Sequence, residues 1–371
     1  MPPILCENLR MLCQRRRHME QTYNLSGMLD LMISPAFAVT DGIIQYCNQA
    51  AQGYMICPGA PLDPLLETGR EEYAALTQGR LYLSVRVEDQ LFGASVTKMD
   101  GADIFLLDPE DSLPQLQAMA LATRELREPL SNMLIATDKL ESGASGVDAE
   151  MRLLKKSLYH MLRLTGNMSD AARYSQQQFP RQELRDITPL IGDVFEKAAL
   201  LAEASGIRLQ FVNYPQPLIT LVDWEKLERA IYNALSNAIK FSQKGSVIDA
   251  KATLHGNKLH LSVQDQGSGI PDAILGNVYH RHLRQPSIED SRFGIGLGMF
   301  MIRNAATTHG GTVLLEKGDP VGTKLTMTIC IRKDLSGNLG SPRLQVDYAG
   351  EMDHGLIELA DVLPSAAFQN I

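Results

Sequence analysis

The chain has 371 residues, of which 44% are hydrophobic and 21% are charged. This length allows about two or three domains with cores of their own, and the composition excludes collagen-like, disordered and disulfide-stapled chains as descriptions of the whole. The formal net charge of −8 at pH 7 provides no basic excess for a general grip on phosphate backbones, so we expect no nucleic-acid partner.

The five cysteines lack paired short spacings, which indicates reduced thiols and neither a disulfide framework nor a zinc site. No stretch reaches the roughly 18 uninterrupted apolar residues of a membrane helix. In the N-terminal segment 1–20, no apolar segment follows the basic residues 15–17, which argues against a secretory signal. We therefore expect a cytoplasmic chain without a membrane span. The basic residues are read as a solvated helix face, with contact to an anionic membrane as the alternative.

Residues 21–110 consist of short apolar runs separated by turn residues. Asp41-Gly42 is a turn signal between two such runs, and apolar and polar residues alternate over 81–88 with the period of a half-buried strand. Further strand-like runs cover 91–99 and 102–107. The pattern predicts a small α+β domain with an antiparallel sheet.

Residues 112–178 change to a heptad pattern, interrupted by the Gly/Ser-rich stretch 142–146. The pattern predicts two helices that form an antiparallel hairpin, each with one apolar stripe. The first stripe is Leu116, Met119, Thr123, Leu126, Leu130, Met133, Thr137 and Leu140, and the second is Leu154, Leu158, Met161, Thr165, Met168 and Ala172. Because a lone hairpin leaves much of these stripes in water, we expect a homodimer in which two hairpins form a four-helix bundle. The alternative is that the hairpin packs on other domains of its own chain.

Residues 185–332 have the pattern of an α/β domain. Helices are predicted over 188–205 and 223–241, with Asp223 as the N-cap of the second. Strands are predicted over 247–254 and 259–263, a helix near 299–309, and two final strands around Gly322. The tail 333–371 contains an apolar patch over 356–363, and a docking segment and a disordered end both remain open.

Three separated elements of the α/β segment carry the chemistry. Asn233 and Asn237 lie four residues apart on one helix, so both amides project from one face, and Lys240 adds a cation. Asp265 ends a predicted strand, and a glycine run opens the next predicted helix, where backbone N–H groups can bind phosphate. The glycines are Gly267, Gly269, Gly294, Gly296 and Gly298. Each element alone is also typical of caps, turns or loops; together they offer amide oxygens for Mg²⁺, a carboxylate for an amine and a phosphate cradle.

These residues resemble the asparagine and glycine boxes in the ATP-binding domain of sensor histidine kinases. The stretches that carry the resemblance are NALSNAIKFS at 233–242, DQGSGI at 265–270, GIGLGM at 294–299, HGG at 309–311 and GTKLTMTI at 322–329. The resemblance implies an α/β sandwich over 185–332 that binds ATP with Mg²⁺. The resemblance also implies that Asn237 holds Mg²⁺ with help from Asn233 and that Lys240 contacts phosphate. Asp265 would accept a hydrogen bond from the adenine amine. The five glycines and Thr323 would shape the pocket and its lid.

The resemblance extends to the predicted hairpin and, weakly, to the first domain. RELREPL at 124–130 is similar to the phosphoacceptor box of the family's dimerisation hairpin, with Glu125 at the position of the base. Residues 27–110, with SPAFAVTDGIIQYCNQAA at 34–51, weakly resemble a PAS sensor domain, and Asn48 falls where such domains often carry an asparagine. The whole is thus expected to be an α+β multidomain chain with a PAS-like domain, a dimerising hairpin and an ATP-binding domain.

Several positions depart from the family's pattern. Arg124 stands where the phosphoaccepting histidine is expected, and a guanidinium has no free lone pair to attack phosphorus. Glu128 stands where many relatives carry Thr or Asn, and VYHRHLR at 278–284 departs from the usual lid. Asn233 stands where ATPases of the wider superfamily have a catalytic Glu, so fast hydrolysis is not expected. We expect His160 to lie at the rim of the bundle and His309 to be structural.

Two functions fit this combination. The first is a dimeric sensor protein of two-component signalling that binds Mg-ATP, with little or no autophosphorylation. The alternative is a non-catalytic scaffold, or pseudokinase, that binds ATP structurally and regulates a partner kinase or response regulator. A third, phosphorylation of a partner's Ser or His as in the anti-sigma-factor relatives, is disfavoured by the hairpin and the PAS-like domain.

Overall fold

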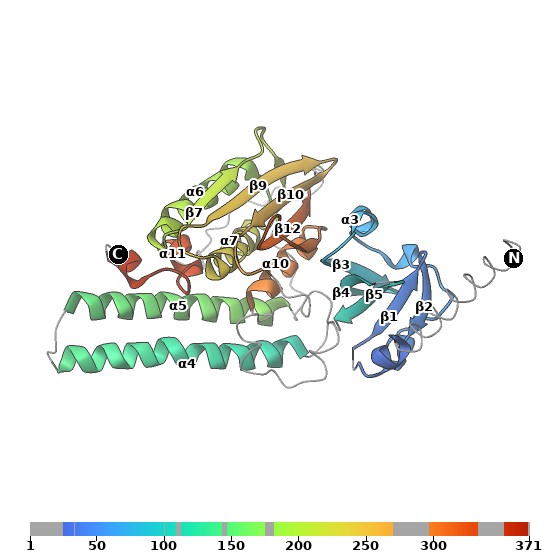
Figure 1. Cartoon of the computed structure of the whole chain (residues 1–371), viewed down its shortest axis with the longest axis horizontal. Coiled ribbons are helices and arrows are strands. Elements are labelled where there is room, and N and C mark those ends of the chain that lie inside the picture. The colour runs from blue at the N-terminus through green and yellow to red at the C-terminus, as the bar shows by residue number, and fades with distance from the viewer. Residues whose placement is uncertain are drawn as a thin grey trace, which may run out of the picture. The chain divides into compact units, whose positions relative to one another are not determined.

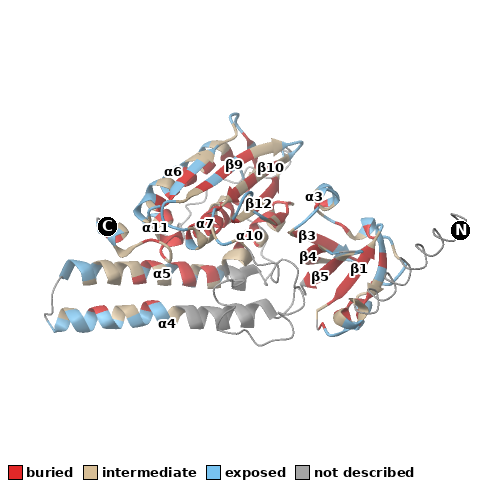
Figure 2. Ribbon diagram, in the orientation of Figure 1, coloured by how far each residue is buried: buried red, intermediate tan, exposed pale blue. Residues whose placement is uncertain are grey.

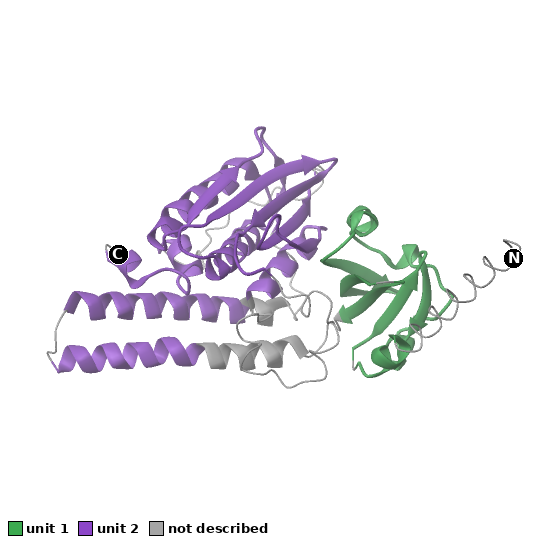
Figure 3. Ribbon diagram, in the orientation of Figure 1, with its two compact units in different colours: residues 1–110, 271–293 green, residues 111–270, 294–371 purple. Residues whose placement is uncertain are grey.

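The computed structural model describes residues 25–32, 34–99, 101–108, 113–142, 147–174, 182–269, 297–332 and 352–369. The predicted N-terminal segment 1–20, the glycines Gly294 and Gly296 and the proposed lid at 278–284 lie outside these residues. Among the described residues, the chain forms two compact units, the first ending at 108 and the second beginning at 113 (Figure 3).

The first unit is built around five antiparallel strands in the order β2-β1-β5-β4-β3 (Figure 1). These are β1 (Ala36–Thr40), β2 (Ile43–Cys47), β3 (Arg80–Val87), β4 (Gln90–Met99) and β5 (Ala102–Asp108), with α2 (Gln49–Gln52), η1 (Asp63–Leu65) and α3 (Arg70–Ala75) between β2 and β3. Asp41 and Gly42 both have positive φ, 51° and 74°, and join β1 to β2 in a tight hairpin. The predicted turn and three strands are therefore present.

The expected half-burial of β3 is wrong. All of its residues except Arg86 are buried, including Tyr82 and Ser84, which the alternating pattern assigned to solvent. The segment after η1 lies along the strand: Leu66 forms a β-bridge with Val85, and the Thr68 hydroxyl accepts a hydrogen bond from the Ser84 N–H. This segment pairs with the edge of β3, and the local alternation of residues 81–88 does not reveal that contact.

The second unit begins with two long helices, α4 (Leu113–Glu141) and α5 (Val147–Tyr174), which pack against each other (Figure 1). Pro129 lies inside α4 without ending the helix, and it is buried. Several apolar side chains of the pair are nevertheless exposed: Leu130, Leu134, Ile135, Val147, Met151, Leu158 and Leu162. The pair alone therefore does not bury its apolar surface.

An α/β layer follows, in which α6 (Ile187–Ala204), α7 (Trp224–Phe241) and α10 (Leu297–Thr308) pack on a mixed sheet of order β11-β12-β10-β9-β7 (Figure 1). Its strands are β7 (Arg208–Val212), β9 (Val247–His255), β10 (Lys258–Gln264), β11 (Val313–Lys317) and β12 (Thr323–Cys330). Strand β7 is parallel to β9, and β6 (Glu183–Asp186) pairs separately with β8 (Ile219–Val222). The expected α+β class is confirmed.

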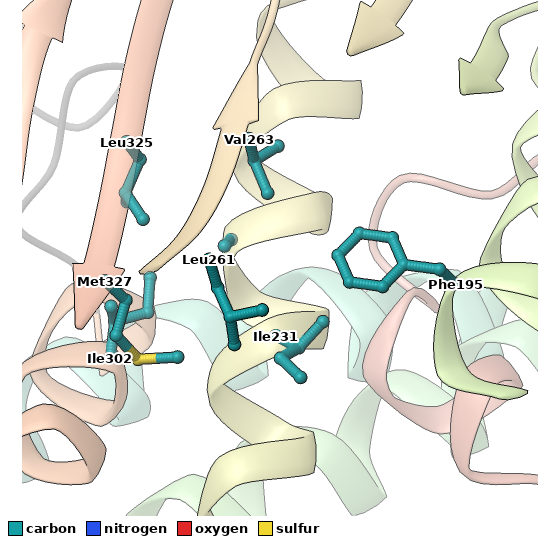
Figure 4. A pocket seen from close by; sticks show the side chains of 8 residues that line it. Phe195, Ile231, Leu261, Val263, Ile302, Leu325 and Met327 are labelled. Atoms are coloured by element: carbon teal, nitrogen blue, oxygen red, sulfur yellow. The ribbon is translucent and has the colours of Figure 1, made fainter. Parts of the chain in front are cut away.

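The core of this layer lies between the helices and the sheet, where buried residues concentrate (Figure 2). Asp186 and Asp223 cap α6 and α7 through hydrogen bonds from Thr188 N and Lys226 N, as predicted for Asp223. A residual cavity of about 10 Å³ remains, with side chains such as Phe195, Ile231 and Leu261 around it (Figure 4). It is entirely apolar and has room for about one water, so it is a packing defect of the core and no nucleotide site.

Part of the C-terminal tail is ordered onto this unit. The helix α11 (His354–Glu358) and the 3₁₀ turn η3 (Ser365–Phe368) contact α5 and α6, and α11 also contacts α7. Residues 352–369 are thus a docked segment. In the described part of the chain, no helix combines the length and apolarity needed to cross a bilayer.

Candidate functional site

Helix α7 carries the two asparagines and the lysine singled out by the sequence. Asn233 is 1% exposed, and both ends of its amide are bonded: Oδ1 accepts from Arg163 Nη2 at 2.9 Å, and Nδ2 donates to the Arg229 carbonyl at 2.8 Å. Asn237, one turn later, is half-buried, and Lys240 is exposed. The side-chain amide oxygen of Asn233 is therefore already hydrogen-bonded within the protein, whereas the side chain of Asn237 lies nearer to solvent.

Asp265 lies directly after β10 and is 5% exposed. Its Oδ1 accepts hydrogen bonds from the backbone N–H groups of Gly267 at 2.8 Å and Thr323 at 3.1 Å, and its own N–H donates to the Thr323 carbonyl. Burial raises the pKa of this carboxyl group, and the hydrogen bonds from Gly267 and Thr323 partly oppose that shift. The result is a rigidly held acid in a poorly solvated position.

Glycines allow the segments around Asp265 to approach closely. A Cβ on Gly267 would lie 2.2 Å from the Phe241 carbonyl oxygen, where α7 ends, and one on Gly322 would lie 2.0 Å from the Asp265 carbonyl oxygen. Gly322 and Gly269 also have positive φ, 92° and 71°, which L side chains rarely adopt. The loop after β10 is thereby held between the end of α7 and the start of β12.

The first residues of α10 meet the asparagine face of α7. A Cβ on Gly298 would lie 2.9 Å from Asn233 Oδ1, so a larger residue there would require the Asn233 side chain or the helix to shift. The described part of the site thus combines three segments: the asparagine face of α7, the loop 265–269 with Thr323 beside it, and the start of α10. Gly294 and Gly296, which precede α10, lie outside the described residues.

Four buried charged or polar residues near Asn233 are not among those that the sequence motifs identify. Arg163 and Asn167 on α5 and Arg229 on α7 are each less than 8% exposed, and Glu358 of α11 is fully buried among them. Arg229 Nη2 donates to Asn167 Oδ1 at 2.6 Å and Arg229 Nε to Glu358 Oε1 at 2.9 Å. One signal was available: Arg229 lies four residues before Asn233, on the same face of α7.

The two histidines discussed from the sequence occupy different environments. His309 is 2% exposed; its Nε2 accepts from the Asp223 N–H at 3.0 Å, and its Nδ1 lies 2.7 Å from the Ala305 carbonyl oxygen. These contacts require a neutral ring that carries its proton on Nδ1, and burial lowers its pKa. His160 is half-buried on α5, and burial lowers its pKa as well.

Arg124 and Glu125 belong to α4, and their side chains lie outside the described ones. Glu128, one turn after Arg124, is exposed. The helical backbone continues through the whole stretch 124–130, so Pro129 does not break the helix at this point.

Comparisons with known proteins find similarity to histidine kinases. Residues 222–333 match the family described as histidine kinase-, DNA gyrase B-, and HSP90-like ATPase. The chain is 27% identical over 237 residues to hybrid signal transduction histidine kinase D of Dictyostelium discoideum, covering 60% of this chain and 15% of that protein. It is 24% identical over 335 residues to sensor histidine kinase WalK of Bacillus subtilis (strain 168), covering 84% of this chain and 53% of that protein.

Among solved structures, the chain is similar to one in the crystal structure of histidine kinase ThkA in complex with response regulator protein TrrA. The aligned region covers 81% of this chain and 96% of the chain in that structure. The sequence identity is 14% and the TM-score is 0.43. The chain thus spans only part of the length of the curated relatives described above.

Proposed function

Because the chain belongs to the histidine kinase family, we propose that it is a sensor protein of two-component signalling that binds Mg-ATP. The observation that carries the proposal is that α7 contacts two segments distant in sequence: the loop of the buried Asp265 at its C-terminal end, and the start of α10 at Asn233. Asp265 is held by two backbone N–H groups, and glycines bring its loop and the start of α10 against α7.

The residues present fit a magnesium nucleotide. Asp265 would accept a hydrogen bond from the exocyclic amine of adenine, because it is a buried, fixed acceptor. The half-buried amide of Asn237 would supply an oxygen ligand for Mg²⁺, which prefers oxygen donors and bridges substrate phosphates. Lys240, on the next turn of α7, would meet phosphate, and the N-terminus of α10, which begins at Leu297, would offer backbone N–H groups to the phosphates.

Asn233 would assist Asn237, as the resemblance implies. Its Oδ1 accepts a hydrogen bond from Arg163, so its contribution is to fix the helix face that carries Asn237. A neutral amide at this position is also a poor base for water, which disfavours fast hydrolysis. The site would hold ATP and turn it over slowly.

Transfer to position 124 is chemically excluded in this chain, since the guanidinium of Arg124 is protonated and has no lone pair for phosphorus. The second candidate function, a pseudokinase scaffold that binds ATP without phosphotransfer, is favoured by this one residue. Its partner would be a response regulator or another kinase. The exposed apolar side chains of α4 and α5 support a homodimer through a four-helix bundle.

We propose a PAS-like sensory role for the first unit. Its support is Asn48, which is 1% exposed and ties the strand β1 to the preceding segment: Oδ1 accepts from Ala36 N, and Nδ2 donates to the carbonyls of Leu29, Met32 and Ser34. Oδ1 also accepts from Ala51 N, so this one side chain holds five backbone groups and would transmit a shift of the N-terminal segment into the sheet.

Incubation with γ-labelled ATP and Mg²⁺ tests the two candidate functions. The scaffold predicts no acid-labile label on the wild type, together with a higher melting temperature in Mg-ATP. Arg124→His should then gain acid-labile label if the remaining machinery is competent, while Arg127→His, an exposed position on the same helix, should not. Acid-labile label on the wild-type chain would reject the scaffold and require another acceptor.

A further inference from the structure

The C-terminal segment, residues 352–369, is anchored in the second unit by apolar side chains. Ile357, Leu359, Leu363 and Phe368 are each no more than 2% exposed. The Phe368 ring lies 5.4 Å from the ring of Tyr159 on α5, and the Ser205 hydroxyl, just after α6, donates to the Val362 carbonyl. The segment therefore contacts both the helical pair and the α/β layer.

The same segment brings two acids to two buried arginines. Glu358, which is fully buried, accepts from Arg229 Nε at 2.9 Å and lies 3.6 Å from Arg163 Nε. Asp361 pairs with Arg163 Nη1 and accepts from the Ser236 hydroxyl at 3.1 Å. Because a buried charge without a partner is very costly, the two guanidinium groups need these carboxylates to remain where they are.

The arginines in turn join α5 to the asparagine face of α7. Arg163 comes from α5 and donates to Asn233 on α7; Arg229 comes from α7 and donates to Asn167 on α5. Arg229 also passes so close to α5 that a Cβ on Gly166 would lie 3.2 Å from its Nη2. The two helices thus share one buried polar cluster, to which the C-terminal segment contributes the carboxylates of Glu358 and Asp361.

We propose that the C-terminal segment is an intramolecular latch, which holds the α/β layer against α5 by neutralising Arg163 and Arg229 and so keeps Arg163 on Asn233. Glu358 and Asp361 are its positioning residues. When the segment is released, the two guanidinium groups lose their counter-charges, the contact between α5 and α7 loosens, and the α/β layer becomes free to move along the helical pair. The latch goes beyond the proposed function and needs no nucleotide.

Hydrogen–deuterium exchange on the full chain without nucleotide tests the latch. In the wild type, amides of 354–368 and of α5 near 157–167 should be protected. Asp361→Asn, at a side chain that is 23% exposed, and Phe368→Ala should each speed exchange there at least tenfold and leave strands β9 and β10 unchanged. The control Asp249→Asn removes one carboxylate at an exposed position of β9 and should change neither region.

Three results would overturn the proposal. Exchange in 354–368 of the wild type at the rate of a free peptide would show that the segment is not docked. Faster exchange of β9 and β10 in both variants would make the segment part of the core of the α/β layer and not a releasable latch. Unchanged protection of α5 in both variants would show that the segment does not hold the helical pair. Because the measurement omits nucleotide, none of these results depends on Mg-ATP binding.

Discussion

Several side chains in the second unit hold backbone segments in place. Asp265 fixes its loop through the N–H groups of Gly267 and Thr323, and His309 joins the end of α10 to the N-cap of α7 through Asp223. Asp223 in turn caps α7, the helix of the asparagine pair. A change at these residues is therefore expected to alter the site through backbone positions.

His309 leads to a prediction about pH. Its pKa in the folded chain is lowered, so as the pH falls below the ordinary histidine value of about 6.5, the unfolded chain binds the proton first and folding is disfavoured. The free energy of unfolding in urea should fall between pH 7 and pH 5.5, by at most about 1.4 kcal/mol per pH unit from this group. His309→Gln, which does not titrate, should reduce this slope relative to the wild type; an identical slope in both proteins would contradict the assignment.

At this scale the sequence predicts residues within motifs and misses their partners. The asparagine pair, Asp265 and the glycines can be identified because each belongs to a motif of only a few residues. The partners of Arg163 and Arg229 cannot be, since Glu358 and Asp361 lie more than a hundred residues further along. Charged residues within the apolar patch 356–363 were the available hint, because a carboxylate in such a run needs a buried partner.

At the scale of elements, close packing at Gly322 determines the position of the loop after β10. Gly322 combines a φ of 92° with a Cβ position 2.0 Å from the Asp265 carbonyl oxygen. Gly322→Ala should lower the free energy of unfolding by about 2–5 kcal/mol, the sum of a left-handed backbone and an overpacked contact. Denaturant titration measures this loss.

Gly256, in the turn between β9 and β10, is a matched control. It also has positive φ, 59°, but open space surrounds its Cβ position. Gly256→Ala should therefore cost only the backbone strain of about 1–2 kcal/mol. Equal losses in the two variants would mean that the contact between Gly322 and Asp265 adds nothing.

Elements with a clear period were predictable, while burial was not. The predicted helix 223–241 is α7, whose bounds are Trp224–Phe241, and the predicted strands 247–254 and 259–263 are β9 and β10. The alternation over 81–88 predicts a half-exposed strand, whereas β3 is buried at every residue except Arg86. The periodicity of apolar residues predicts whether a segment forms a helix or a strand. The burial of that segment depends on which other parts of the chain pack against it.

For the whole molecule, the exposed apolar residues of α4 and α5 predict a dimer. Leu134→Glu, at a side chain that is 67% exposed, should place a charge in the proposed four-helix bundle and shift the chain to monomer in sedimentation velocity. Leu200→Glu is the control, because Leu200 of α6 is also 67% exposed but lies outside the helical pair. A wild-type monomer, or a dimer that both variants retain, would contradict the bundle.

The measurement that tests the account most directly is calorimetric titration of the full chain with Mg-ATP. We predict saturable binding at one site that requires Mg²⁺. Asp265→Asn should weaken it roughly 10- to 150-fold, the range expected for a hydrogen bond to a charged group of about 1.5–3 kcal/mol, because Oδ1 can still accept from the two backbone N–H groups while an amide NH₂ replaces the second acceptor. No binding at millimolar nucleotide, or equal affinity in the wild type and Asp265→Asn, would contradict a nucleotide site at this carboxylate.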